Sequence, residues 1–190
     1  MRNFFAFIVV VLIYCSNSLY AQAPVTRPAV TFEIKNLGIA TNGSIGGLLT
    51  KVHFTPANLN SSTVEASVDV NTINTDNSSR DEHLRSEDFF DVSHYPKMVL
   101  KSVAFKHKNG NSFIGVFTLT IKGKAKQIEI PFTVLDKENV FEFKGTFKIN
   151  RLDFGVGGTS MILSNDVIVN IDCEEKKTGL DSNITPFFSR

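Results

Sequence analysis

The chain has 190 residues, and its 20 Lys and Arg nearly balance its 19 Asp and Glu. Balanced charge without a basic cluster argues against nucleic acid as a partner and against an anionic membrane face. Its two cysteines are Cys15 and Cys173. With Cys15 inside the N-terminal segment described next, an intramolecular disulfide and zinc sites built from cysteine pairs are excluded.

The first 23 residues predict a signal peptide. Arg2 supplies positive charge, Phe4 to Tyr14 is an apolar run, and Ala21-Gln22-Ala23 is typical of a cleavage site. The run is shorter than the roughly 18 residues of a membrane span, so no stable span is expected. Lipidation of Cys15 is the weaker alternative, because a small residue should precede it. We therefore expect a periplasmic or secreted protein, cleaved near Ala23, with one domain over residues 24–173.

Short strands with period-two alternation follow. Thr31 to Leu37 is the first, and a Gly-rich bend from Gly43 to Gly47 leads into a second strand ending near Phe54. From Val64 to Val70 every second residue is apolar. This half-buried pattern predicts strands with one face turned toward a core.

The segment from Ser78 to Met98 is the densely charged part of the chain and predicts a helical lid between strands. Ser79 and Glu82 fit a capping box, and a second turn is expected to start at Ser86. Pro96 disfavours helix before it, so the next strand should begin near Met98.

The rest of the chain again alternates. A mixed strand from Met98 to Phe105 ends at a hairpin turn with Asn109-Gly110. The expected apolar faces after it run from Phe113 to Ile121, Ile128 to Val134, Phe141 to Ile149 and Val167 to Ile171. About eight antiparallel strands with one apolar face each indicate an all-β barrel or sandwich, and an eight-stranded barrel is wide enough for one small ligand. Residues 174–190 form a polar tail that the pattern does not place.

Phenylalanine dominates the aromatic residues, with 17 Phe against 3 Tyr and no Trp. Phenylalanine has no polar group, so its side chains suit either a filled core or a pocket for hydrocarbon. Residue type alone does not distinguish these two uses.

The segment RDEHLRSEDFFDVSHYP, residues 80–96, resembles the signature of the YceI-like family of secreted polyisoprenoid-binding proteins. LTIKGKAKQIEIPF, residues 119–132, and NRLDFGVG, residues 150–157, look like further family motifs, and the similarity runs from about Thr31 to Ile171. It implies an eight-stranded antiparallel lipocalin-like barrel that holds an isoprenoid lipid. One departure is Asn36, which stands where the family has an early histidine.

Taken with this resemblance, the Phe-rich strands and the lid predict an apolar ligand-binding cavity. The residues expected there are Phe89, Phe90, Phe113, Phe117, Leu119, Phe132, Phe141, Phe143 and Phe147. A structural role in the lid, capping helix ends and pairing with one another, is expected for Arg80, Asp81, His83, Arg85 and Asp91.

The resulting interpretation is a non-enzymatic carrier of an isoprenoid or related long-chain lipid, without cofactor or metal. A ligand-free structural or interaction barrel is the alternative, and a secreted metal-dependent enzyme is a third. Asp81, His83 and Asp88 resemble an acid/base cluster, but no nucleophile motif accompanies them. His83 and His94 lack the spacing of a metal motif. The oligomeric state, a homodimer included, stays open.

Overall fold

The computed structural model describes residues 29–177 and is built from one antiparallel sheet of nine strands. The strands are β1 Val30–Asn36, β2 Ile39–Ile45, β3 Leu49–His53, β4 Thr63–Asp69, β5 Lys97–Asn109, β6 Ser112–Ile121, β7 Lys124–Asp136, β8 Val140–Asn150 and β9 Leu163–Lys176. Helix α1 spans Ser78–Arg85, and the single 3-10 turns are η1 Leu59–Ser61, η2 Val70–Thr72 and η3 Arg151–Phe154. The prediction of an all-β antiparallel barrel is confirmed.

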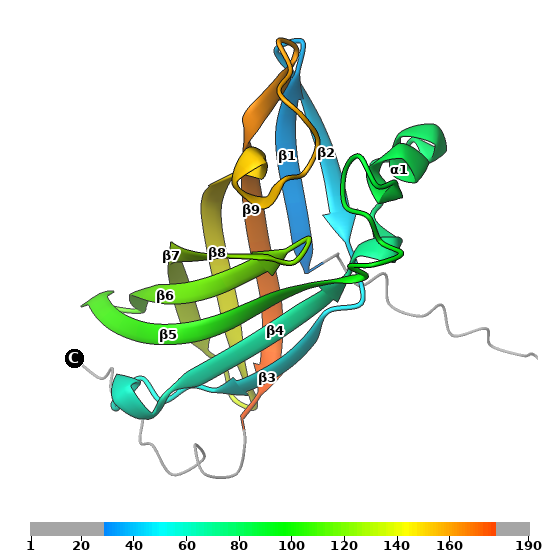
Figure 1. Ribbon diagram of the computed structural model, residues 1–190. Helices are drawn as coiled ribbons and strands as arrows, with labels where there is room; N and C mark the ends of the chain where they lie inside the picture. Colours follow the sequence, from blue (N-terminus) through cyan, green and yellow to red (C-terminus); the bar gives the residue numbers. More distant parts are fainter. Residues whose placement is uncertain (1–28, 178–190) are drawn as a thin grey trace, which may run out of the picture.

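The sheet curls on itself in the order β2-β1-β9-β8-β7-β6-β5-β4-β3 (Figure 1). Its two edge strands, β2 and β3, are consecutive in the chain. Near this seam Ser44 of β2 exchanges two backbone hydrogen bonds with Asn74, which follows η2, and the Asp69 N–H at the end of β4 donates to the Gly46 carbonyl at 3.1 Å. Thr50 of β3 also donates to the Glu175 carboxylate of β9. These contacts tie β2 to the segment before α1 and tie β3 to β9, so they hold the two edges of the half-barrel in place.

The strand number differs from the eight predicted, because β2 occupies part of the segment predicted as a Gly-rich bend. Its sequence, IATNGSI, lacks apolar alternation. It is nevertheless paired with β1 at every position from Ile39 to Ile45. Gly43 suits this pairing, since a Cβ there would lie 2.4 Å from the Phe32 ring. Tertiary pairing therefore outweighs the weak local propensity.

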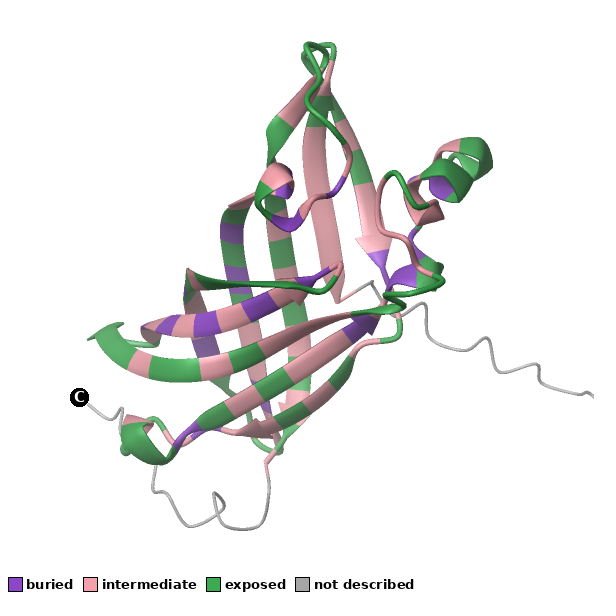
Figure 2. Cartoon of the chain, in the orientation of Figure 1, coloured by how far each residue is buried: buried purple, intermediate pink, exposed green. Residues whose placement is uncertain are grey.

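Alternating burial is clearest in β6, where Phe113, Gly115, Phe117, Leu119 and Ile121 are all buried (Figure 2). The apolar face predicted for this strand is confirmed. The apolar interior falls into one cluster around Phe117 and Phe154, a second around Phe54, and a third that joins Ile45 and Ile73 to the lid. The predicted strands therefore surround one interior, and different apolar clusters occupy different parts of it.

The predicted domain boundaries fall near the ends of the described residues. The predicted signal peptide lies outside the described residues. Strand β9 continues to Lys176 and so includes the first residues of the segment that the sequence pattern does not place. Between residues 29 and 177, no helix is long and apolar enough to cross a membrane.

Candidate functional site

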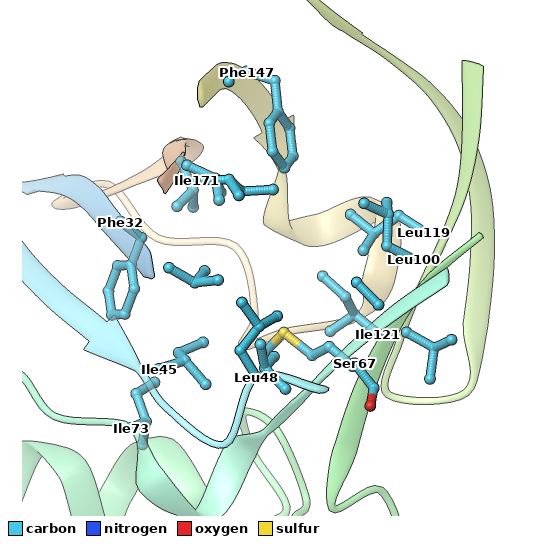
Figure 3. A pocket seen from close by; sticks show the side chains of 18 of the residues that line it. Phe32, Ile45, Leu48, Ser67, Ile73, Leu100, Leu119, Ile121, Phe147 and Ile171 are labelled. Atoms are coloured by element: carbon cyan, nitrogen blue, oxygen red, sulfur yellow. The ribbon is translucent and has the colours of Figure 1, made fainter. Parts of the chain in front are cut away.

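The curled sheet encloses an apolar cavity of about 400 Å³ (Figure 3). All nine strands contribute side chains to its wall, and the lid contributes Leu84, Phe89 and Phe90. Phe32, Ile171 and Leu119 are among the side chains that Figure 3 shows around the open space. The volume lies in the range of pockets that hold small molecules, and a wall so poor in polar groups suits a hydrocarbon ligand.

Most of the predicted cavity residues do line this space. They are Phe89, Phe90, Phe117, Leu119, Phe132, Phe143 and Phe147. Phe113 and Phe141 were predicted with them but lie elsewhere, packed with Phe54 and Val134 in a filled part of the interior. They share the inner face of their strands with cavity residues, but sit farther along the barrel.

Phe54 is the centre of this filled part, which we call the Phe54 plug: Phe54, Phe113, Val134 and Phe141. Phe54 is 2% exposed. Its ring meets those of Phe105 and Phe113 edge to face, with centroids 5.4 and 5.2 Å apart. Such aromatic pairs pack closely and leave no room for a ligand. The plug therefore closes the barrel on one side of the cavity.

Sequence reasoning missed a second group of cavity residues. They are the apolar Phe32, Ile45, Leu48, Leu100, Ile121 and Ile171 and the polar Ser67. The alternation of the strands did place several of them on an apolar face. The alternation could not show which apolar faces border the cavity, because that depends on how the sheet curls.

The lid is held by hydrogen bonds between α1 and the segment before it. The buried Asp81 carboxylate accepts hydrogen bonds from the Thr75 N–H at 2.9 Å and the Thr75 hydroxyl at 2.6 Å. Arg80 donates to the Thr75 hydroxyl and carbonyl, and Arg85 donates to the Asn71 and Ile73 carbonyls. The guanidinium groups thus donate hydrogen bonds to backbone carbonyls in the segment before α1, which is not part of a strand.

Two details of the lid prediction are wrong. The N-cap is Asn77, whose side chain accepts a hydrogen bond from the Arg80 N–H at 2.9 Å, instead of Ser79. Arg80, Asp81 and Arg85 bind Thr75 and backbone carbonyls instead of one another. Asn77 is an equally good cap by residue type, so the pattern alone could not choose.

The other two predicted lid residues are His83, which lies in α1, and Asp91, which lies in the turns that follow α1. The His83 ring packs edge to face on Phe89, which lines the cavity. Asp91 accepts a hydrogen bond from His94 at 2.8 Å, which raises the pKa of that imidazole. Both contacts help to fix the turns that follow α1, and the second turn does start at Ser86 as predicted.

Asp81→Ala is expected to lower the free energy of unfolding by about 1–3 kcal/mol, because the Thr75 N–H would be left buried without an acceptor. Urea denaturation of the folded protein measures this change. Glu82→Ala is the matched control, since Glu82 is the exposed next residue of the same helix. Equal stability of the two variants would contradict the structural role of Asp81.

A glycine-rich loop after η3 fixes the lid from the other side. The Gly157 N–H donates to the Asp88 carbonyl at 3.0 Å. Gly157 has a φ of 66°, and a Cβ there would lie 2.9 Å from the Phe89 ring. The buried Arg151 holds the loop by donating to the Val156 and Gly158 carbonyls. The NRLDFGVG motif is thus a support for the lid and the cavity wall.

Several residues of the cavity wall are polar, but they expose little polar surface to the cavity. The Asn36 Oδ1 atom is buried without a hydrogen-bond partner and its residue lines the cavity, as do Arg80 and Cys173. In the part of the chain that the structure describes, no three His, Cys, Asp or Glu side chains are grouped so that they could hold a metal ion. His83 and His94, the pair weighed as ligands, instead contact Phe89 and Asp91.

Cys173 is expected to react slowly with iodoacetamide near neutral pH. Burial raises the pKa of its thiol to about 11, with smaller contributions from Glu175 and Asp172. At pH 8 only about one thiol in a thousand would be the reactive thiolate, and the rate should rise roughly tenfold per pH unit toward 11. Peptide mass spectrometry after alkylation measures this at Cys173. A rate that levels off near pH 8.5 would contradict it.

Comparison of the sequence with known proteins identifies the family of this chain. The sequence model of the YceI-like domain matches residues 22–175. The chain belongs to the YceI-like family. A UPF0312 protein of Vibrio cholerae serotype O1 is 27% identical over 135 residues, which cover 67% of this chain and 71% of the relative. The family resemblance of residues 80–96 is therefore confirmed.

Solved structures show the same fold. Burkholderia cenocepacia BcnA has a TM-score of 0.74 and 25% identity, covering 77% of this chain and 94% of its own. A polyisoprenoid-binding domain from Saccharophagus degradans has a TM-score of 0.61 and 14% identity, covering 78% and 93%. The YceI-like fold is thus shared across distant sequences.

Proposed function

We propose that this protein is a non-catalytic carrier that holds an isoprenoid or similar long-chain lipid inside the barrel. The observation that carries the proposal is the cavity itself, which is enclosed by apolar side chains from all nine strands and the lid. A filled structural barrel would have no need for this space, since protein interiors are normally packed without large voids.

The family and the chemistry of the wall support a lipid as the ligand. A member of the fold from Saccharophagus degradans is described as polyisoprenoid-binding. Branched aliphatic and aromatic side chains match a chain of isoprene units, which carries no polar atom along its length. Binding comes from apolar area removed from water, at about 25 cal/mol per Å², and is reduced by the ordering of the flexible chain.

The proposal includes export. The first 23 residues have the features of a cleaved signal peptide, so the carrier would work in the periplasm or outside the cell. A soluble carrier in such a compartment shields a lipid from water while it moves. Intact-mass measurement of the protein isolated from the cell envelope should give an N-terminus at or near Pro24. Retention of Met1 or acylation of Cys15 would contradict this part.

The test of the carrier function is extraction of the purified protein with organic solvent, followed by mass spectrometry of the extract. One long-chain lipid in near-stoichiometric amount is the expected result. Protein purified without detergent is needed, because detergent can fill an apolar cavity. An extract empty of lipid, with failure to take up a polyprenol added from vesicles, would favour the ligand-free barrel.

A further inference from the structure

One end of the barrel carries four exposed apolar side chains, which we call the apolar tip: Leu37, Ile39, Met161 and Ile162. Leu37 and Ile39 are 70% and 71% exposed, Met161 is fully exposed, and Ile162 is 52% exposed. The first pair lies on the turn between β1 and β2, and the second lies in the loop before β9. The Leu37 N–H donates to the Ile162 carbonyl at 2.8 Å, so the two loops lie side by side at the top of Figure 1.

The turn at the tip does not favour leucine. Leu37 and Gly38 are the two central residues between the paired Asn36 and Ile39, and both have positive φ, 51° and 77°. Such two-residue hairpin turns are usually formed by Asn-Gly or Asp-Gly, because other side chains are strained at positive φ. A leucine that is strained and exposed contributes little to folding. Its presence therefore points to a contact outside the chain.

Both loops of the tip are uncharged. Residues 36–44 and residues 156–165 contain no Asp, Glu, Lys, Arg or His. The flanking charge on β1 is the exposed Lys35. An uncharged apolar protrusion can enter the boundary between lipid head groups and acyl chains without burying a charge, and a flanking lysine can remain at the head groups.

The cavity reaches the base of the tip. Asn36 and Leu163 are paired across β1 and β9, and both line the cavity. The next residues outward are Leu37 and Ile162, which belong to the tip. Along β9 the path from the cavity wall to the exposed end of the barrel is apolar, and along β1 the polar Asn36 stands between the cavity and Leu37.

We propose that the apolar tip inserts into the surface of a lipid bilayer and that the cavity exchanges its lipid there. The docking step rests on the exposed tip alone. The exchange step rests on the proposed carrier function. A bilayer is the occupant that fits, because the tip is small, uncharged and protruding, and because its apolar surface leads into an apolar cavity.

Flotation with vesicles tests the docking step. Wild-type protein is mixed with vesicles of phosphatidylcholine, and separately with vesicles that also contain phosphatidylglycerol, and the floating fraction is measured. The variant Leu37→Asn with Ile39→Ser should reduce this fraction at least about fivefold. Its melting temperature should be unchanged or higher, because asparagine is favoured at positive φ in this turn.

The matched control is Leu49→Ser with Val103→Ser. These residues are also exposed, at 63% and 56%, but they lie on β3 and β5 instead of the tip. The control should float like the wild type. A wild type that floats with neither vesicle, or a control that loses as much binding as the tip variant, would overturn the docking proposal. So would a dimer that the tip variant converts to monomer without any flotation, since this would assign the tip to self-association.

Lipid extraction from the same samples separates this proposal from the carrier function. A wild type that carries lipid but does not float overturns docking and leaves the carrier in place. A wild type that floats without ever carrying or taking up lipid overturns the carrier function and the exchange step, but leaves docking. If both hold, the tip variant should keep its bound lipid in solution and exchange it with vesicles at least about fivefold more slowly.

Discussion

Ile171→Asp is expected to abolish lipid retention. Ile171 is on β9, and its side chain points toward the open space of the cavity (Figure 3). A carboxylate there must either take up a proton or draw water into the cavity, and both states bind hydrocarbon poorly. The amount of lipid extracted per protein should fall about a hundredfold or more, which corresponds to a loss of a few kcal/mol of binding free energy.

Ile168→Asp is the control for this change. Ile168 is on the same strand, has the same side chain, and is 39% exposed on the outer surface. This variant should keep its lipid and most of its stability. Circular dichroism of both variants establishes that they fold. Undiminished lipid in folded Ile171→Asp would show that the ligand does not occupy the cavity.

Phe54→Ala is expected to cause the largest loss of stability, about 3–5 kcal/mol of unfolding free energy. Phe54 is the centre of the Phe54 plug and contacts four other phenylalanine rings, at centroid distances from 5.2 to 5.7 Å. Alanine would leave a cavity where the Phe54 ring meets these four rings. Urea denaturation of the lipid-free protein measures the change.

Phe32→Ala is the matched substitution in the cavity. The Phe32 side chain lies at the open space, so it has fewer protein neighbours to lose than Phe54. It should cost about 1–2 kcal/mol of stability and lower lipid binding more strongly than Phe54→Ala does, measured at a temperature where both are folded. Equal stability losses in the two variants would contradict the division of the interior into a filled plug and an open cavity.

The lid and most of the strands could be predicted from sequence because their signals are local. Alternation placed Phe117 and Leu119 on an inner face, and the charged segment gave a helix followed by a strand near Met98. Strand β2 could not be predicted in the same way. Its residues carry little β propensity, and it exists because β1 presents a complete set of hydrogen-bonding partners.

The extent of the cavity could not be predicted for a different reason. Phe113 and Phe117 share one face of β6, yet Phe113 belongs to the plug and Phe117 lines the cavity. Periodicity shows which side of a strand a residue faces, but not how far along the barrel axis the interior is filled. The curl of the sheet, and the position of Phe54 from a loop after β3, decide that.

The seam between β2 and β3 has a consequence for how the barrel can change its girth. Elsewhere around the barrel, neighbouring strands are joined by antiparallel backbone ladders, with register shifts between β1 and β9 and between β5 and β6. At the edges the connections are fewer, such as those of Ser44 on β2 with Asn74 and of Thr50 on β3 with Glu175 on β9. Increasing the girth of the barrel therefore costs the fewest hydrogen bonds here. If the protein carries lipid as proposed, we expect the barrel to widen at this seam for thicker lipids while the remaining wall keeps its register.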